Sequence, residues 1–342
     1  MTAPGAFSSI RSTLRYNPAL DGIRALAVLA VLAHHAEAPW LQGGFIGVDV
    51  FFVLSGFLIT RLLRDELEAS GRLSLPRFYA RRAVRLYPTL LLVIVAVLAA
   101  SPGLWREALL AGLYLSDYSV ALFETPIVLA HTWSLSVEEH FYLLWPLLLP
   151  WVLRQPDPPR VLLRFYVCAL IWSGLSLIFF DWNLTYCRFD ARLGGLALGC
   201  WLALARLPQM PRYTGWAALA MLALLGFAAS YGAGNAMIVF ILAQASAAGL
   251  IAATTQGTGP TAMLVRLRYV GKLSYGLYLW HWPIFYWLLM QRQGWAVTLL
   301  AGGATTLVLA AISYHGADVP LQGLKRRFSG GGRAGLAPEL IK

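Results

Sequence analysis

The sequence predicts an all-α fold, a polytopic membrane helical bundle of about ten transmembrane helices with one further re-entrant or interfacial helix. Hydrophobic residues make up 58% of the 342 residues and charged residues only 13%, about half the charged share of a typical soluble domain. The mean hydropathy is +0.63. The apolar residues also form blocks, such as 90–100, 216–229 and 236–253. With their flanks, these blocks approach the ~20 residues that a membrane-spanning helix needs.

Ten stretches are interpreted as spanning helices, and they cover residues 19–36, 44–61, 87–101, 134–153, 162–180, 190–206, 214–231, 236–254, 271–290 and 296–315. Between the third and fourth lies the segment 102–133, whose apolar stretch 107–115 is short for a span. We interpret this stretch as the re-entrant or interfacial helix. If it crossed the membrane instead, every later loop would change side.

The distribution of basic residues tests this count. With the N-terminus in the cytoplasm, 22 of the 27 Lys and Arg fall on the cytoplasmic side, four fall in outer loops or outer span ends, and Arg24 lies within a span. Basic residues concentrate in the cytoplasmic loops of membrane proteins. The asymmetry therefore favours ten spans in the inner (plasma) membrane with both termini cytoplasmic, whereas eleven spans would mix basic loops across both sides.

The predicted organisation is one membrane domain, residues 16–320, between a cytoplasmic N-terminal tail, 1–15, and a cytoplasmic C-terminal tail, 321–342. The first apolar block contains Asp21 and Arg24 and is followed by no small-residue cleavage site. We therefore expect no cleavable signal peptide.

The net charge of +11 would suggest a nucleic-acid partner in a soluble protein. Here the cytoplasmic loops account for it, so we expect membrane lipid as a partner and no nucleic acid. The three cysteines, Cys168, Cys187 and Cys200, show no CxxC spacing, which predicts neither a disulfide framework nor a metal site.

The first span carries four ionisable side chains, Asp21, Arg24, His34 and His35. Asp21 and Arg24 are three residues apart, share a helix face and can pair. Arg24 and His35 are almost three turns apart on one face, about 16 Å along the axis, while His34 points about 100° away. An intramembrane ionisable residue often marks function. We interpret His35 as a general base because imidazole titrates near neutral pH; the alternative is a histidine at the outer interface.

The second span places Asp49 deep in an apolar stretch. Such a carboxylate is expected to be functional or to pair with a buried cation. Ser55 and Gly56 follow on the same helix, and small residues of this kind are typical of close helix packing.

Between the second and third spans, Arg82 and Arg85 lie three residues apart on a predicted amphipathic helix. One interpretation is a helix at the lipid surface with snorkelling arginines. The other is an anion site, because guanidinium groups suit phosphate oxygens.

Two further spans contain polar side chains. The fourth opens with Ser134, Glu138 and Glu139, and two adjacent carboxylates at the start of a membrane helix suggest that at least one lines a cavity. The ninth places Tyr278 and His281 among aromatic residues ahead of a proline. These aromatics suit an interface belt, and His281 suits a structural or acceptor-side role.

Taken together, these segments resemble acyltransferase family 3, a family of integral membrane O-acyltransferases. The resemblance rests on five motifs that occur in family order and cover most of the chain from about 16 to 320, namely LDGIRALAVLAVLAHH, GGFIGVDVFFVLSGFLIT, FYARRAVRLYP, HTWSLSVEEHFYLLWP and LSYGLYLWHWPIF. Any one of them alone would be a weak signal, whereas the set is specific.

The resemblance implies a ten-helix membrane domain and assigns several roles. Its Arg-x10-His motif is matched by Arg24 and His35, which implies that His35 is the catalytic histidine. Its RxxR motif is matched by Arg82 and Arg85, which would contact the phosphates of coenzyme A. Its acidic motif is matched by Ser134, Glu138 and Glu139.

Three features depart from the family pattern. Position 140 is His where Gln is common, and Asp318 and Pro320 stand where a Glu-x-Pro pattern is usual. Many members also carry a fused extracytoplasmic esterase-like domain that has no counterpart in this sequence. A second reaction step would then need a separate protein.

These observations predict a membrane O-acyltransferase that moves an acyl group, acetyl by default, from acyl-CoA to a hydroxyl of a carbohydrate acceptor. Acyl-CoA is a donor substrate, and no permanently bound cofactor is expected. Glu138 or Asp49 would orient the imidazole of His35. Glu139, Ser134, His281 and Tyr278 would contact substrate. Direct transfer and an acyl-enzyme on His35 both remain open.

The alternative function is a membrane transporter or flippase of a glycan or lipid-linked intermediate, because ten spans and intramembrane charges suit it equally well. A structural membrane protein without catalysis explains the buried ionisable residues poorly. Acyl-CoA distinguishes the acyltransferase from the transporter, since an acyltransferase should consume acyl-CoA and a flippase should ignore it.

Overall fold

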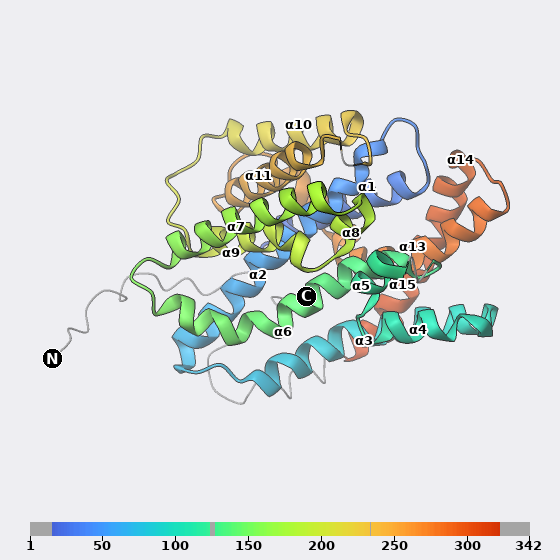
Figure 1. Cartoon of the computed structure of the whole chain (residues 1–342), viewed down its shortest axis with the longest axis horizontal. Helices are drawn as coiled ribbons and strands as arrows, with labels where there is room; N and C mark the ends of the chain where they lie inside the picture. Colours follow the sequence, from blue (N-terminus) through green and yellow to red (C-terminus); the bar gives the residue numbers. More distant parts are fainter. Residues whose placement is uncertain (1–15, 124–126, 233, 322–342) are drawn as a thin grey trace.

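The computed structural model describes residues 16–123, 127–232 and 234–321, and these form helices without any strand. The expected tails, 1–15 and 322–342, lie outside the described residues. The longer helices are α1 (Pro18–His35), α2 (Gly47–Ser70), α3 (Leu75–Ala100), α6 (Trp133–Leu153), α7 (Pro158–Phe179), α9 (Leu193–Leu204), α10 (Tyr213–Ala228), α11 (Ala236–Thr255), α13 (Arg268–Met290) and α15 (Gly303–Ser313). Figure 1 shows them running roughly along the long axis of the molecule.

Each of the ten predicted spans coincides with one of these helices. Five helical stretches are long and apolar enough to cross a membrane, namely Gln42–Ser70, Leu75–Ala100, Pro158–Phe179, Ala236–Thr255 and Trp295–Leu321. The helix Tyr213–Ala228 is apolar but shorter. The all-helical membrane fold is therefore confirmed, whereas the count of about ten spans stays a prediction.

The structure corrects the expected region between the second and third spans. Instead of a separate amphipathic helix followed by a span, α3 runs unbroken from Leu75 to Ala100 with Pro88 inside it. A proline removes one backbone hydrogen bond, and membrane helices tolerate this where neighbours satisfy the freed carbonyl. Arg82 and Arg85 therefore lie on the first half of a long helix.

The segment 102–133 folds into two helices of eight residues, α4 (Trp105–Gly112) and α5 (Ser116–Phe123), flanked by 3-10 turns. Eight residues extend only about 12 Å, which is too short to cross a bilayer. The predicted short helix is present, and a second one follows it.

Two glycine contacts bring central helices together. A β-carbon on Gly56 of α2 would lie 2.1 Å from the carbonyl oxygen of Leu196 on α9, and one on Gly271 of α13 would lie 1.9 Å from that of Asp21 on α1. No other residue fits at such distances, so the packing role predicted for Gly56 is confirmed. The second contact fixes α13 beside the start of α1.

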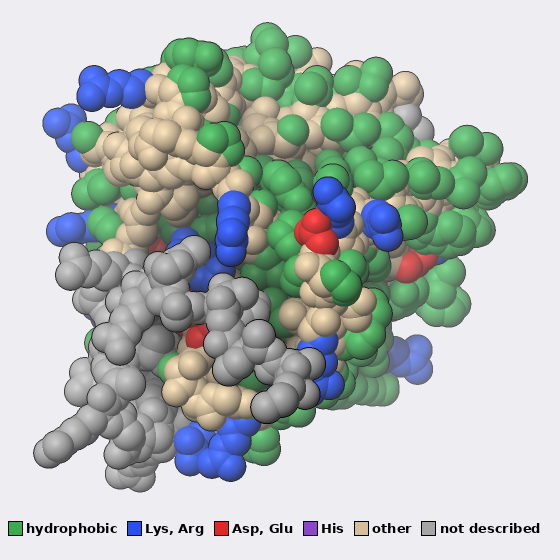
Figure 2. Space-filling model, turned by 90° about the vertical axis from the view of Figure 1, so that its left-hand side faces the viewer, with side chains coloured by type: hydrophobic (Ala, Val, Ile, Leu, Met, Phe, Trp, Pro, Cys, Tyr) green, Lys and Arg blue, Asp and Glu red, His purple; other side chains and the backbone are tan. Residues whose placement is uncertain are grey.

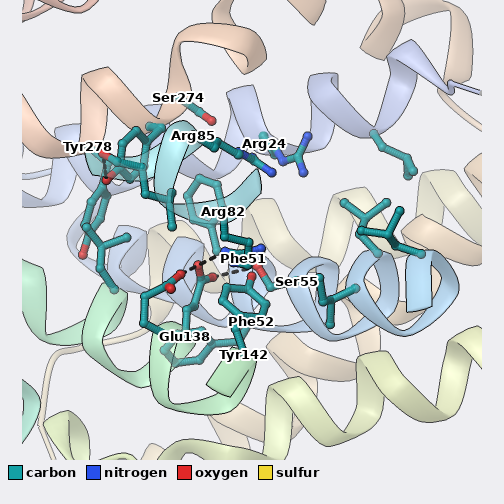
Figure 3. A pocket seen from close by; sticks show the side chains of 18 of the residues that line it. Arg24, Phe51, Phe52, Ser55, Arg82, Arg85, Glu138, Tyr142, Ser274 and Tyr278 are labelled. Atoms are coloured by element: carbon teal, nitrogen blue, oxygen red, sulfur yellow. Dashed lines mark hydrogen bonds and ion pairs between the residues drawn. The ribbon is translucent and has the colours of Figure 1, made fainter. Parts of the chain in front are cut away.

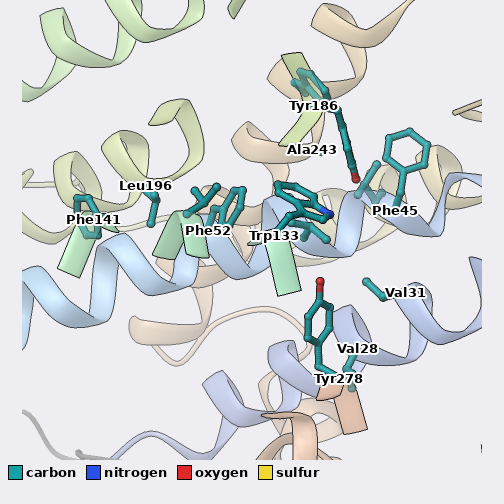
Figure 4. Packing of buried hydrophobic residues seen from close by; sticks show 14 of the residues in the cluster. Val28, Val31, Phe45, Phe52, Trp133, Phe141, Tyr186, Leu196, Ala243 and Tyr278 are labelled. Carbon is teal, nitrogen blue, oxygen red and sulfur yellow. The ribbon is translucent and has the colours of Figure 1, made fainter. Parts of the chain in front are cut away.

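The buried aromatic and aliphatic core lies around α2, as Figure 4 shows for Phe52, Trp133 and Leu196. The outer helices α3 and α7 instead expose large apolar side chains, including Leu91, Val95, Ile171 and Ile178. Exposed apolar surface of this extent is what a lipid-facing helix requires.

The basic loops gather at one end of the bundle. The turns after α2, α6 and α9 lie together at the left of Figure 1. Figure 2, which looks onto that end, shows lysine and arginine side chains around it. This clustering agrees with the asymmetry on which the predicted topology rests.

Candidate functional site

A cavity of about 280 Å³ opens at the end of the bundle that carries the basic loops. Its lining residues include Leu20 near the start of α1, Phe78 near the start of α3 and Thr255 at the end of α11. We call it the arginine cavity because five arginines line it, Arg24, Arg61, Arg81, Arg82 and Arg85. Three acidic residues also line it, Asp21, Glu138 and Glu139, so the cavity carries an excess of positive charge.

The RxxR arginines differ in how they are held. The guanidinium of Arg82 donates to Glu139 Oε1 at 2.9 Å and lies 3.4 Å from the ring centroid of Tyr142. Arg85 lines the same cavity but forms no ion pair with a described residue, and Figure 3 shows its side chain beside that of Arg24. Arg85 therefore retains hydrogen-bond donors for an anionic ligand.

The remaining predicted charges of this cavity pair locally. Arg24 binds Asp21 at 2.7 Å, which confirms the expected contact within α1. Glu138 accepts a hydrogen bond from Ser55 Oγ at 2.8 Å (Figure 3). Ser55 therefore holds a carboxylate at the cavity wall, a contact that the expected role in helix packing did not include.

Tyr278 separates this cavity from a second one, because Tyr278 and Val48 line both. The Tyr278 hydroxyl donates to the carbonyl oxygen of His131 at 2.8 Å and lies 2.7 Å from Ser134 Oγ. Figure 4 shows this hydroxyl pointing toward Trp133. Ser134 and Tyr278, two of the four residues expected to contact substrate, thus form part of the wall between the two cavities.

The second cavity has a volume of about 350 Å³ and lies toward the opposite ends of the helices. We call it the aromatic cavity, since most of its lining side chains carry rings: His34, His35, Phe45, Trp133, Tyr186, Tyr231, Tyr278 and Trp282. Aromatic walls with a few polar groups are typical of small-molecule sites. Arg24 and His35, although on one helix, therefore face different cavities.

The imidazole of His35 has a histidine as its partner. His35 Nδ1 lies 2.9 Å from His281 Nε2, and the two rings stack with centroids 5.0 Å apart. His35 Nε2 has no hydrogen-bond partner among the described residues, and it is not fully buried. This nitrogen is therefore open to the aromatic cavity.

Neither carboxylate expected to orient His35 contacts it. Glu138 lies in the arginine cavity with Ser55. Asp49 is fully buried and accepts hydrogen bonds from Arg192 at 3.0 Å and from Gln244 at 3.1 Å. Of the two roles considered for Asp49, the structure therefore shows the partner of a buried cation.

Two side chains that support the cavities were missed in the sequence. Arg192 was placed in an outer loop or span end, yet only 3% of it is exposed and its guanidinium lies 4.0 Å from the ring centroid of Phe240. Tyr142, under Arg82, was not singled out. A usable signal was the lone Asp49, because a buried carboxylate needs a cation.

The departures from the family pattern also have partners. His140 lies 3.2 Å from the buried carboxylate of Asp117, away from Glu139 and outside both cavities. Asp318 accepts a hydrogen bond from Thr89 Oγ1 at 3.0 Å. It thereby links the end of the last helix to α3.

Comparisons with known proteins agree with this architecture. A family model described as an acyltransferase domain matches residues 17–315. The chain is 33% identical to the O-acetyltransferase OatA of Staphylococcus aureus over 90% of its own length and 57% of that protein. It is 32% identical to the peptidoglycan O-acetyltransferase OatA of Listeria monocytogenes, over 91% of the chain and 57% of the relative.

A putative peptidoglycan O-acetyltransferase of Bacillus subtilis, YrhL, is 31% identical over 90% of the chain and 55% of the relative. The chain thus spans little more than half the length of the curated relatives it matches. No solved structure matches it.

Proposed function

The chain belongs to the acyltransferase family whose model covers residues 17–315, and from this premise we propose that it transfers an acyl group from acyl-CoA to a glycan hydroxyl. The observation that carries the proposal is the position of His35. Its Nε2 is open to the aromatic cavity, and a wall that includes Tyr278 and Val48 separates this cavity from the arginine cavity. A base beside one substrate site, next to a phosphate-binding site, is the arrangement that acyl transfer from coenzyme A needs.

The arginine cavity suits the donor. Coenzyme A carries several phosphates, and Arg85 and Arg61 form no ion pair with a described carboxylate. Guanidinium groups recognise phosphate through paired hydrogen bonds. Because this cavity opens among the basic loops, we place it on the cytoplasmic side of the plasma membrane, with both termini on that side.

The aromatic cavity suits the acceptor. Sugar rings present apolar C–H faces together with hydroxyls, and rings such as Trp133, Tyr186 and Trp282 supply flat apolar walls with polar edges. Two relatives, named peptidoglycan O-acetyltransferases, support a cell-wall glycan as acceptor and acetyl as the acyl group.

The proposed reaction uses His35 as general base. His35 Nε2 takes the proton of the acceptor hydroxyl while its oxygen attacks the thioester carbonyl. The carbon–sulfur bond then breaks, and the thiolate takes the proton from the imidazolium, so that free coenzyme A and an ester leave. In the alternative two-step route, the acyl group first moves from the thioester to His35 with release of coenzyme A, and then from His35 to the acceptor hydroxyl. In either route the thioester must reach past Tyr278, which requires breaking the hydrogen bonds of its hydroxyl.

Membrane vesicles incubated with labelled acetyl-CoA and the acceptor glycan test this function. We expect ester-linked label with wild type and none above background with His35→Ala. His140→Gln is the matched control, since His140 lines neither cavity. Size-exclusion profiles in detergent establish that both variants fold. Equal label with His35→Ala would remove the base from the proposal. Glycan movement across the vesicle membrane without acyl-CoA consumption would favour the transporter instead.

A further inference from the structure

We propose that His281 is a positioning residue that fixes the tautomer and the orientation of His35. The inference rests on the proposed role of His35 as the base. It differs from the acceptor-side role expected of His281, because His281 is fully buried and lines neither cavity. Its effect on substrate must therefore pass through His35.

The hydrogen-bond chain assigns the protons. His281 Nδ1 lies 2.6 Å from the carbonyl oxygen of Tyr278, and a carbonyl only accepts, so this nitrogen carries a hydrogen. A neutral imidazole has one N–H, which leaves His281 Nε2 as an acceptor. His35 Nδ1, 2.9 Å away, must donate to it. The lone pair of His35 then lies on Nε2, the nitrogen that is open to the aromatic cavity.

The neutral state of His281 follows from its surroundings. The ring packs edge-on against Phe285 and His131, with centroids 5.7 and 5.3 Å away, and no described carboxylate forms an ion pair with it. A charged ring here would be a buried cation without a counter-charge, which is costly. The same packing holds the ring plane, so the acceptor nitrogen keeps its direction toward His35.

Helix packing aligns the two histidines. α1 and α13 run in the same direction, since Asp21 meets Gly271 near their starts and His35 meets His281 further along. Trp282, next to His281 on α13, also packs against the His35 ring at 4.8 Å. His35 is thus held by one hydrogen bond, by the stacked His281 ring and by the tilted Trp282 ring, which restrict its Nε2 to one direction.

An imidazole in this place does what a carboxylate does in other base–orienter pairs, with one difference. It accepts the hydrogen from Nδ1 and so selects the tautomer, but it adds no negative charge. Among the described residues, no ion pair is therefore buried beside His35 when the base takes up a proton.

The test compares two variants of His281 in proteoliposomes supplied with labelled acetyl-CoA. His281→Phe keeps a ring and removes the acceptor. We expect it to lower kcat by about 10²–10⁴-fold, the range for losing a correctly held base, with KM for acetyl-CoA nearly unchanged. His281→Gln keeps an oxygen near the Nε2 position and should recover at least about tenfold of that loss. His140→Gln, which alters a histidine that lines neither cavity and contacts neither His35 nor His281, is the control and should resemble wild type.

A spectroscopic measurement makes the test independent of turnover. In ¹⁵N-histidine-labelled protein, His35 should be the Nδ1–H tautomer in wild type and His281→Gln, and should lose that preference in His281→Phe. A wild-type Nε2–H tautomer, or wild-type kcat in His281→Phe, would overturn the inference. Failure of the proposed role of His35 as the base gives a different result, namely full transfer by His35→Ala while His35 of the wild type still shows the Nδ1–H tautomer.

Discussion

Arg82 and Arg85 show how two residues of one motif differ in their roles. The charge of Arg82 is already matched by Glu139, and its flat guanidinium lies on Tyr142. Arg85 has no such partner among the described residues and points into the same cavity. The first arginine therefore helps to hold α3 against α6, and the second is available to an anionic ligand.

This difference predicts that the same substitution affects donor binding at Arg85 and stability at Arg82. Arg85→Gln should raise KM for acetyl-CoA about tenfold or more, because one charge-assisted phosphate contact is worth about 1.5–3 kcal/mol, and should leave thermal stability unchanged. Arg82→Gln should lower the unfolding temperature because it leaves Glu139 without its cation. Transfer kinetics and thermal unfolding in detergent measure the two effects. A stable Arg82→Gln with only a KM defect would contradict the division.

The residues that line the cavities were easier to predict from the sequence than the side chains that they contact. His35, Arg24 and Glu138 line cavities, as their positions in apolar helices suggested, and the RxxR arginines, predicted on an amphipathic helix between two spans, line one as well. Their partners could not be read, because helical periodicity reports which residues share a face of one helix and not which helix lies opposite. The partners His35 and His281 are 246 residues apart.

Among the elements, one buried ion pair joins three helices. Asp49 lies on α2, Arg192 precedes α9, and Gln244 lies on α11. Side-chain exposure is 1% for Arg192 and 0% for Asp49. The network therefore belongs to the scaffold around the aromatic cavity rather than to its chemistry.

Asp49→Leu should accordingly destabilise the bundle, since breaking a buried pair costs about 3–5 kcal/mol by leaving an uncompensated charge. The double variant Asp49→Leu/Arg192→Met should regain most of the lost unfolding temperature. Arg160→Gln, which removes an exposed pair with Asp157 but keeps the Asp157 cap of α7, is the control and should change stability by at most about 1 kcal/mol. If the double variant unfolds as early as the single one, the pair is not the cause.

Element boundaries were predictable where apolar runs are unbroken and less so elsewhere. The ends of α7 and α11 lie within a few residues of the predicted spans. The start of α3 does not, because the polar, arginine-rich stretch before Pro88 reads as a loop helix. Arg81, Arg82 and Arg85 of this stretch can lie within a long membrane helix because they line the arginine cavity.

For the whole molecule, the two ends of the bundle should face different compartments. Gln293 lies in the turn after α13 and Arg72 in the turn after α2, and both are exposed. Seven predicted spans separate these turns. In a variant without the three native cysteines, Gln293→Cys should react with an impermeant maleimide in intact cells. Arg72→Cys should react only after permeabilisation. Equal labelling in intact cells would refute the topology.

The contact between α1 and α13 also has a consequence for how the protein is made. α1 enters the membrane early in synthesis with Asp21, Arg24 and His35 in place, while α13, which supplies Gly271 and His281, emerges some 250 residues later. Until then the polar face of α1 lacks its final neighbour in the bilayer. The reactive centre is therefore completed among the last steps of biogenesis, and a chain released before α13 would be inserted yet inert.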